Sequence, residues 1–480
     1  MNDRKGFGSN FGFLMAAVGS AVGLGNIWGF PNKMGANGGV PFLILYLALA
    51  LCCGVIIMLG ELALGRKTGH GAVGAYQSIS KRFKWLGWLG IAAAALIFSF
   101  YSALGGYCLR YVVVNFGNLI GAEFGTNGVG GADVFQGLLS QPDVSIAFAL
   151  AFMLITMLVV MSGVGGGIER VCSVGMPALF FILIICIIRS CTLPGAADGL
   201  KYMFVPGWAV ANGIIDEAPG FWRVLTAAGG QMFFSLSLGA GVMITYGSYL
   251  DKKQDLGKSA MIIVGMDTVV ALMAGLCVIP GRFALDPNGA LGGPELLFIT
   301  MQNVFDKMGP AGPVFGILFY LLVFFAAISS SISMLEVIVA HFCDKAREKG
   351  KGDRRKLYSA IAVVICAALC ALVCADGMGS NHISPAELLG LAGAKLPGWS
   401  TSWLGLFDSV AEGLLMPLGA LLMCLMISWE LKPDALRQEI LLNGENRPWV
   451  YDFFRLCVKY ITPLCMLMIL YGQISDFFIV

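Results

Sequence analysis

The sequence predicts an all-α polytopic membrane protein with about eleven transmembrane helices, two of them broken at mid-membrane. Of the 480 residues, 58% are hydrophobic and only 12% are charged, and the mean hydropathy is +0.80. Soluble globular domains carry about 25% charged residues, so this composition excludes an ordinary soluble protein. The apolar residues form runs long enough to cross a bilayer, and glycine and serine interrupt two of these runs.

Apolar runs of roughly 18 residues or more can each span the hydrocarbon core. They lie at residues 10–30, 41–65, 86–117, 144–162, 169–191, 221–250, 258–280, 311–343, 357–375, 403–429 and 449–474. The first ten residues are too short and polar for a cleavable signal. Most of the 14 cysteines lie inside apolar runs without metal-binding spacing, and we assign them no redox or metal role. We therefore expect a single membrane domain over residues 1–480.

The basic residues predict the orientation of the chain. If the N-terminus is cytoplasmic, the inner connections hold most of the lysine and arginine, including seven residues between 345 and 356. Only six basic residues then lie outside: Lys33, Lys201, Arg223, Arg282, Lys307 and Lys395. The positive-inside rule favours this orientation, and an odd number of helices places Val480 outside.

The first apolar run contains an unusual segment from Ala17 to Pro31, in which four glycines accompany Asn26. Glycine costs a helix about 1 kcal/mol relative to alanine, so this density predicts a helix that opens within the membrane. Opened carbonyl groups and the Asn26 oxygen can replace the hydration shell of a small cation, and the start of a half-helix can hold an anionic group. The alternative is close helix packing through small residues.

A second interruption lies in the sixth run, where serines and glycines occupy Phe234 to Gly241. Five helices separate the two interruptions, so helices 1–5 and 6–10 would be related by opposite orientation in the membrane. We expect inverted repeats at about 10–191 and 221–429, with an extra helix at about 449–474. Paired broken helices in inverted repeats are typical of a secondary transporter with its site at the midplane.

Polar residues inside other runs favour the same interpretation. Helix 8 carries four serines within residues 329–333, more than the single back-bonded hydroxyl of many membrane helices. Ser329 and Ser330 can offer oxygen ligands to a hard cation. Asp267 lies deep in helix 7 and must be protonated, paired or close to a cation, because an unpaired intramembrane acid is costly. Glu61 either binds freed backbone N–H groups or acts directly.

These motifs, taken in order, resemble the neurotransmitter:sodium symporter family, bacterial branch, with the leucine-transporter fold. The resemblance extends from Arg4 to helix 11 and rests on Ala-Val-Gly-Leu-Gly-Asn with Phe-Pro, on Glu61 to Arg66, on Phe-Phe-Ser-Leu-Ser-Leu-Gly and on the serine pair of helix 8. It implies a sodium-coupled symporter without enzymatic activity. The expected partners are an amino acid, sodium ions and the lipid bilayer of a bacterial inner membrane, with no nucleic acid.

The resemblance implies two sodium sites and a substrate site. One sodium would be held between helices 1 and 8 by Gly19, Val22, Ala326, Ser329 and Ser330, and the other by Ala21, Asn26, Ser235 and Asp267 beside the substrate carboxylate. That carboxylate would also meet Leu24, Gly25 and Tyr101. The remaining predicted substrate contacts are Ala21, Gly23, Ile97, Phe234, Ser235, Ser237, Ala240, Ser330 and Met334.

The resemblance also implies two gates. Arg4, Ser248, Tyr249 and Asp344 match the inner gate, with Phe7 where tryptophan is usual. Gly167 and Pro177 resemble the glycine-to-proline element at which helix 5 unwinds. At the outer gate, Gly29 replaces the arginine that normally pairs with an acid of helix 10, for which Asp408 is the candidate. The sequence therefore leaves open how the outer side closes.

The favoured function is import of neutral L-amino acids by alternating access. Ala240 stands where many relatives carry a bulky aromatic residue, so large hydrophobic or aromatic substrates are expected. Amine carriers of this family have an aspartate where this chain has Gly23, which favours a substrate that brings its own carboxylate. A sodium-coupled carrier of small or ω-amino acids or amines is the alternative, and an ion channel is a more remote one. Because Asp267 supplies a fixed negative charge, we expect transport without chloride. Once sodium leaves, burial favours the neutral acid, so a proton would move in the opposite direction.

Overall fold

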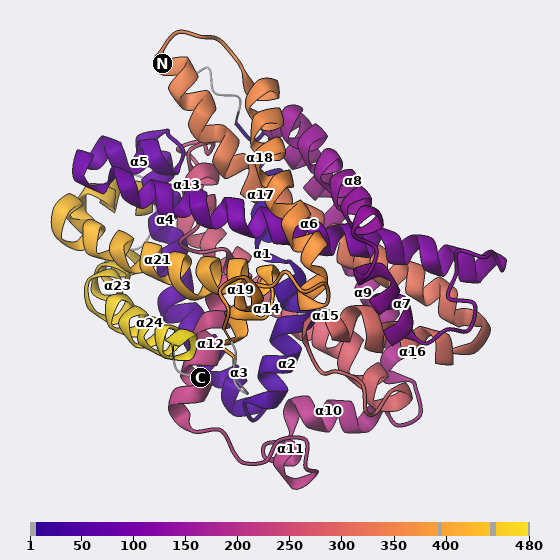
Figure 1. The fold of residues 1–480 in the computed structure, drawn as a ribbon. Helices are drawn as coiled ribbons and strands as arrows, with labels where there is room; N and C mark the ends of the chain where they lie inside the picture. The colour runs from indigo at the N-terminus through magenta and orange to yellow at the C-terminus, as the bar shows by residue number, and fades with distance from the viewer. Residues whose placement is uncertain (1–5, 392–395, 442–447, 479–480) are drawn as a thin grey trace.

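The computed structural model describes residues 6–391, 396–441 and 448–478, and this part of the chain is helical without strands (Figure 1). Nine of its helices are long and apolar enough to cross a membrane, and one bent helix pair passes the same test as a single span. The structure confirms the predicted all-α membrane fold. The number of eleven spans stays a prediction, because the segment 221–250 is divided into pieces shorter than a span.

The bent pair is the first predicted broken helix. It consists of α1 (Asn10–Ala21) and of a π-helical turn (Gly25–Gly29) that leads into α2 (Phe30–Ala36). The helix axis bends by 53° between the two halves. Val22 leaves the helical conformation with a ψ of 106°, directly before Gly23. The backbone thus opens inside the glycine-rich segment, as predicted.

The second broken helix is formed by α12 (Phe221–Leu236) and α13 (Val242–Gly247). Between them the chain adopts the left-handed conformation at Ser237, Gly239 and Gly241, with φ values of 52°, 82° and 75°. Glycine reaches this region without the steric cost that other residues bear, which explains why the break falls on this Gly-x-Gly segment.

The remaining helices surround these two breaks. The longer ones are α3 (Val40–Leu49) continuing through Ala50–Gly54 into α4 (Val55–Thr68), α6 (Lys84–Ile120), α8 (Pro142–Met161), α9 (Arg170–Cys191), α14 (Leu256–Leu285), α17 (Gly312–Glu348), α18 (Arg355–Asp376), α20 (Trp403–Asp408) continuing through Ser409–Leu415 into α21 (Met416–Leu425), and α23 (Pro448–Leu456) continuing through Cys457–Ile461 into α24 (Thr462–Phe478). The shorter ones are α5 (Ala72–Ile79), α7 (Gly131–Leu139), α10 (Ala196–Phe204), α11 (Trp208–Ala211), α15 (Gly293–Glu295), α16 (Met301–Lys307), α19 (Pro385–Leu388) and α22 (Arg437–Ile440).

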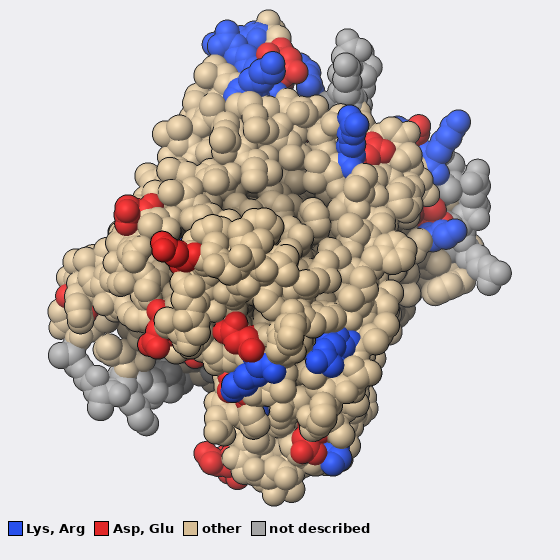
Figure 2. Space-filling model, turned by 90° about the vertical axis from the view of Figure 1, so that its right-hand side faces the viewer, with Lys and Arg blue, Asp and Glu red and all other residues tan. Residues whose placement is uncertain are grey.

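The two 37-residue helices α6 and α17 pack extensively against each other beside α1. Both run past the apolar windows that predicted them, because their ends carry polar residues that a hydropathy window excludes. Most of the space-filling face in Figure 2 is uncharged. A cluster of its lysine and arginine side chains lies at the upper end, where Figure 1 places the connection from α17 to α18, and other basic side chains stand singly over the rest of the face.

Candidate functional site

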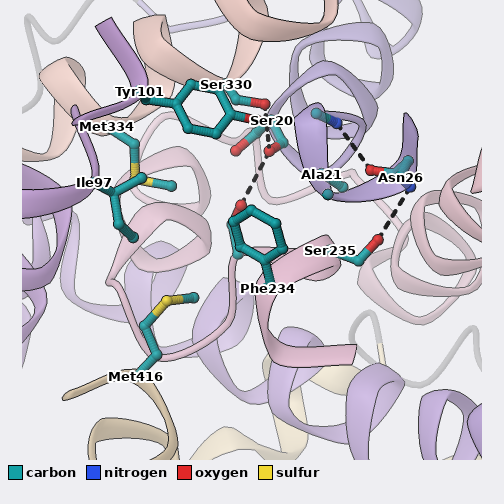
Figure 3. A pocket seen from close by; sticks show the side chains of 13 residues that line it. Ser20, Ala21, Asn26, Ile97, Tyr101, Phe234, Ser235, Ser330, Met334 and Met416 are labelled. Carbon is teal, nitrogen blue, oxygen red and sulfur yellow. Dashed lines mark hydrogen bonds between the residues drawn. The ribbon is translucent and has the colours of Figure 1, made fainter. Parts of the chain in front are cut away.

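A cavity lies where the two broken helices face each other (Figure 3). Ten of the twelve predicted substrate residues line it, and Leu24 and Ala240 do not. The lining consists of Ser20, Ala21, Gly23, Gly25, Asn26, Ile97, Tyr101, Phe234, Ser235, Ser237, Ser330, Met334 and Met416. Residues from α1, α6, α12, α17 and α21 thus meet at one point, although they are up to about 400 positions apart in the sequence.

The space at the centre of this cavity is about 20 Å³, which is enough for one water molecule. Phe234 contributes to this narrowness, because its ring packs directly on the backbone of Gly25, where an added Cβ would lie 2.2 Å from the ring. An amino acid therefore fits only after the lining side chains move apart.

The break in α1 directs backbone groups toward this cavity. The amide of Leu24 donates a hydrogen bond of 2.5 Å to the hydroxyl of Tyr101, and the amide of Gly23 donates one of 2.9 Å to Oδ1 of Asn26. Both amides lie beyond the end of α1, where no helical partner is available to them. Amide and hydroxyl donors grouped in this way can hold a carboxylate.

Oxygen atoms of α1 and α17 converge at the same break, close to the Tyr101 hydroxyl. The Ser330 hydroxyl lies 3.3 Å from the carbonyl oxygens of Gly19 and Val22 and 3.2 Å from that of Ser20. Neighbouring Ser329 has its hydroxyl 3.1 Å from the carbonyl of Ala326, and an added Cβ at Gly19 would approach Ser329 to 3.0 Å. The structure thus brings the five residues predicted for the first sodium site together, and their carbonyl and hydroxyl oxygens suit a hard cation.

Asp267 is fully buried and lies beside Asn26. Its carboxylate accepts hydrogen bonds from the Asn26 side-chain amide at 2.8 Å, from Ser235 at 2.7 Å and from Tyr46 at 3.3 Å. Among the described residues, no lysine or arginine forms a salt bridge with it. Three of the four residues predicted for the second sodium site are therefore directly connected, while Ala21 lines the cavity next to them.

Two buried polar side chains hold the broken helices in place. Oε1 of Glu61 accepts a hydrogen bond of 2.7 Å from the amide of Gly239, so this acid satisfies a backbone group freed by the break between α12 and α13. The Gln231 side chain donates to the carbonyl of Gly25 at 3.1 Å. Each contact satisfies opened backbone that would otherwise be costly inside a membrane.

The predicted inner gate lies around the end of α13. The Phe7 ring packs edge-on against Tyr246 and Tyr249, with ring centroids 5.6 and 6.3 Å apart. The Ser248 hydroxyl donates to its own helix, at the carbonyl of Thr245. Asp344 accepts a hydrogen bond from the amide of Gly71 at 2.9 Å. Arg4 lies outside the described residues.

An ion pair that the sequence did not predict reinforces this end. Arg355 contacts the carboxylate of Glu336 through two nitrogens, at 2.5 and 2.9 Å, and the Tyr249 hydroxyl donates to the same carboxylate at 2.5 Å. Glu336 is completely buried. The pair therefore joins α17, the start of α18 and the end of the second broken helix.

Sequence reasoning also missed Ser20 and Met416 in the cavity. The Ser20 carbonyl accepts a hydrogen bond from Ser237 at 3.0 Å, which links the two broken helices. Ser20 follows Gly19 in the glycine-rich segment, and this position could have predicted that it lies at the cavity. Met416 reaches the cavity from a helix whose register no motif fixes. Asp408, the predicted outer-gate acid, lies in a separate crevice together with Lys33 and Glu412.

Comparisons with known proteins identify the family of the chain. The model of the sodium:neurotransmitter symporter family matches residues 4–127 and 132–478. An uncharacterised sodium-dependent transporter of Bacillus subtilis is 36% identical over 97% of both chains. Another, from Methanocaldococcus jannaschii, is 30% identical over 91% of this chain and 84% of its own length.

A solved structure gives the same result for the fold. The crystal structure of MhsT in complex with L-phenylalanine superposes with a TM-score of 0.82 and 34% identity, over 98% of this chain and all of that chain. The helical membrane fold, the paired helix breaks and the family match lead to one conclusion: the chain belongs to the sodium:neurotransmitter symporter family and is a multi-pass, sodium-coupled membrane transporter.

Proposed function

We propose that this transporter imports neutral L-amino acids with large hydrophobic or aromatic side chains, driven by sodium, through alternating access. It would work as a single domain of two inverted repeats, with a cytoplasmic N-terminus and an extracytoplasmic C-terminus. The observation that carries the proposal is the Leu24 amide beside the Tyr101 hydroxyl, because it offers carboxylate-binding donors at the edge of a mostly apolar cavity.

The apolar part of the cavity supports a large side chain. Ile97, Phe234, Met334 and Met416 line it from four different helices. Methionine side chains adapt to ligands of different shape, and burial of apolar surface contributes about 25 cal/mol per Å². The complex of MhsT with L-phenylalanine, a relative of the same fold, supports the same substrate class.

Two sodium ions would accompany the substrate. The first would bind between α1 and α17, where the carbonyls of Gly19 and Val22 face Ser330. The second would bind among Asn26, Ser235 and Asp267, next to the substrate carboxylate. Coupling follows from this neighbourhood, because the ion and the carboxylate attract each other in a site shielded from water.

An amine carrier is less well supported. Such a substrate needs a fixed anion for its ammonium group, and the family's amine carriers place an aspartate at the position of Gly23. Here a Cβ at that position would lie 2.3 Å from the Tyr101 hydroxyl and 2.9 Å from that of Ser330. The space for a side chain is already filled, so the negative charge must come from the substrate itself.

Asp267 also supports transport that needs no chloride. Its carboxylate supplies a negative charge among Asn26, Ser235 and Tyr46, where a bound anion would otherwise balance the sodium charges. After sodium and substrate leave, a buried carboxylate without a cation is favoured in its protonated form. The empty carrier would then return with a proton.

Thermal unfolding with added ligands tests the proposal. Phenylalanine, tyrosine, tryptophan or leucine should raise the unfolding temperature in sodium but not in potassium, because binding to the folded state stabilises it. Glycine should have a smaller effect. Equal stabilisation in both salts would exclude sodium coupling, and stabilisation only by amines would favour the alternative carrier.

A further inference from the structure

A groove of about 740 Å³ lies between the first turns of α12 and the last turns of α24, two helices that pack side by side (Figure 1). The side chains that shape it are Trp222, Arg223, Leu467, Met468, Tyr471 and Ser475. None of them belongs to the central cavity or to the predicted sodium sites. The groove is therefore a separate feature of the molecule.

Close packing of α12 against α24 fixes the direction of the groove. A Cβ added at Gly472 would lie 2.1 Å from the Thr226 side chain, so the backbone of α24 touches α12 at this turn. One turn away, a Cβ at Gly229 would lie 2.4 Å from Ile469. Because the residue number rises on one helix while it falls on the other, the two helices are antiparallel here.

Large exposed side chains indicate that the groove faces the bilayer. Trp222 is 63% exposed, Leu467 54% and Tyr471 77%. The helical segment Pro448–Ser475, which carries two of them, is long and apolar enough to cross a membrane. Tryptophan and tyrosine are enriched where the hydrocarbon core meets the headgroups. We therefore place the groove at this level of the membrane.

The polarity of the groove changes along its length. Arg223 near the start of α12 and Ser475 near the end of α24 lie at the same end, because the helices are antiparallel. Leu467 and Met468 line the deeper part, and the seven residues from Met468 to Ser475 correspond to about 10 Å along the helix. A polar end followed by an apolar part matches the headgroup and the acyl chain of a phospholipid.

The charge at the polar end selects the headgroup. Arg223 is exposed, and among the described residues it forms no salt bridge. Arginine binds phosphate through two parallel N–H bonds. The described lining contains neither aspartate nor glutamate, so a headgroup that carries its own cation finds no partner there. The groove is thus complementary to a lipid with a net negative charge.

We propose that this groove binds one anionic phospholipid, with its phosphate on Arg223 and an acyl chain along Leu467 and Met468. The rings of Trp222 and Tyr471 would flank the region between headgroup and chain. The bound lipid would hold α24 against α12. This inference goes beyond the proposed function and uses the proposed orientation only to assign the lipid to the outer leaflet.

Quenching of tryptophan fluorescence tests the site, because Trp222 lines the groove. The purified full chain in neutral detergent is titrated with phosphatidylglycerol or phosphatidylcholine, both with brominated acyl chains. The part of the quenching that is lost in Trp222→Phe reports this groove. Phosphatidylglycerol should bind about fivefold more tightly than phosphatidylcholine, as expected for one basic residue near an anionic headgroup. Equal affinities of the two lipids would overturn the proposal.

Variants identify the groups that bind the lipid. Arg223→Gln should remove the preference for phosphatidylglycerol, and Arg223→Lys should keep part of it, since lysine retains the charge without the planar fork. Leu467→Ser should weaken both lipids alike. Lys201→Gln is the matched control, because Lys201 is exposed outside the groove and pairs with Asp198 at 3.0 Å. A preference that persists in Arg223→Gln would contradict the assignment.

A second copy of the chain is the other possible occupant, and the mass of the protein in detergent, measured by light scattering, distinguishes it. A dimer that Tyr471→Ala converts to monomers would make the groove a protein interface and overturn the lipid site. A monomer, or a dimer that Tyr471→Ala leaves intact, agrees with a bound lipid. The measurement needs no substrate, so the proposed function can fail independently of it.

Discussion

The side-chain amide of Asn26 donates a hydrogen bond of 2.8 Å to Oδ1 of Asp267 and lies 3.1 Å from the Ser235 hydroxyl. These three groups come from three different helices, and two of those helices are broken beside them. Sodium, substrate carboxylate and a fixed negative charge would therefore meet in one buried place. The pair of Asn26 and Asp267 is the point at which ion and substrate binding can be coupled.

Removal of the Asp267 charge should change the ion requirement. Asp267→Asn keeps the size of the side chain but loses the negative charge, so sodium-driven uptake should either stop or respond to chloride. Uptake into proteoliposomes with chloride or gluconate measures this. In the unmutated protein, chloride should have no effect and internal acid should change uptake, since a proton must replace sodium on the carboxylate. Strict chloride dependence or indifference to internal pH would contradict this account.

Removal of one hydroxyl at the junction of α1 and α17 should weaken sodium binding. Ser329→Ala should raise the sodium concentration required for substrate binding about tenfold, because a lost cation ligand costs at least about 1.4 kcal/mol. Asn26→Ala should do the same at the second site. Ser331→Ala is the matched control, since Ser331 is buried in the same helix and its hydroxyl has no partner among the described residues. An unchanged sodium requirement in both Ser329→Ala and Asn26→Ala would disprove the assignment.

Loss of the inner ion pair should destabilise the fold. Arg355→Met leaves the Glu336 carboxylate buried without its cation, which typically costs about 3 to 5 kcal/mol. The unfolding temperature should fall, and the further change Glu336→Gln should restore part of the loss. Arg347→Met, at an exposed arginine 3.8 Å from Asp344, is the control. If both arginine variants unfold at the same temperature, the pair has no such role.

Substrate size should depend on residues at the cavity and at the neighbouring break between α12 and α13. Ala240→Phe introduces a ring at the break between α12 and α13, so the substrate preference should shift toward smaller amino acids. Met416→Ala enlarges the cavity from the other side and should favour tryptophan over leucine. Competition against labelled phenylalanine measures both changes. Because Ala240 does not line the cavity in this structure, an effect only at Met416 would place the size filter on α21.

The helix breaks could be predicted because they are local. Glycine density around Asn26 and the Gly239 and Gly241 pair determine where the backbone opens, and a hydropathy pattern finds the spans around them. The Glu336–Arg355 pair could not be predicted, because Arg355 is one of seven basic residues between 345 and 356 and nothing in the sequence distinguishes it from the others. Met416 was missed for a similar reason: the π-helical stretch Ser409–Leu415 between α20 and α21 shifts the register of the cavity face. Pairing and register of this kind depend on tertiary packing.

Sodium-driven uptake by proteoliposomes, with all twenty amino acids as competitors, tests the central claim most directly. An inward sodium gradient should drive accumulation of labelled phenylalanine, and tryptophan, tyrosine, phenylalanine and leucine should compete best, because the cavity offers donors for one carboxylate and apolar walls for the side chain. Accumulation without a sodium gradient, or competition led by glycine or a charged amino acid, would contradict the account.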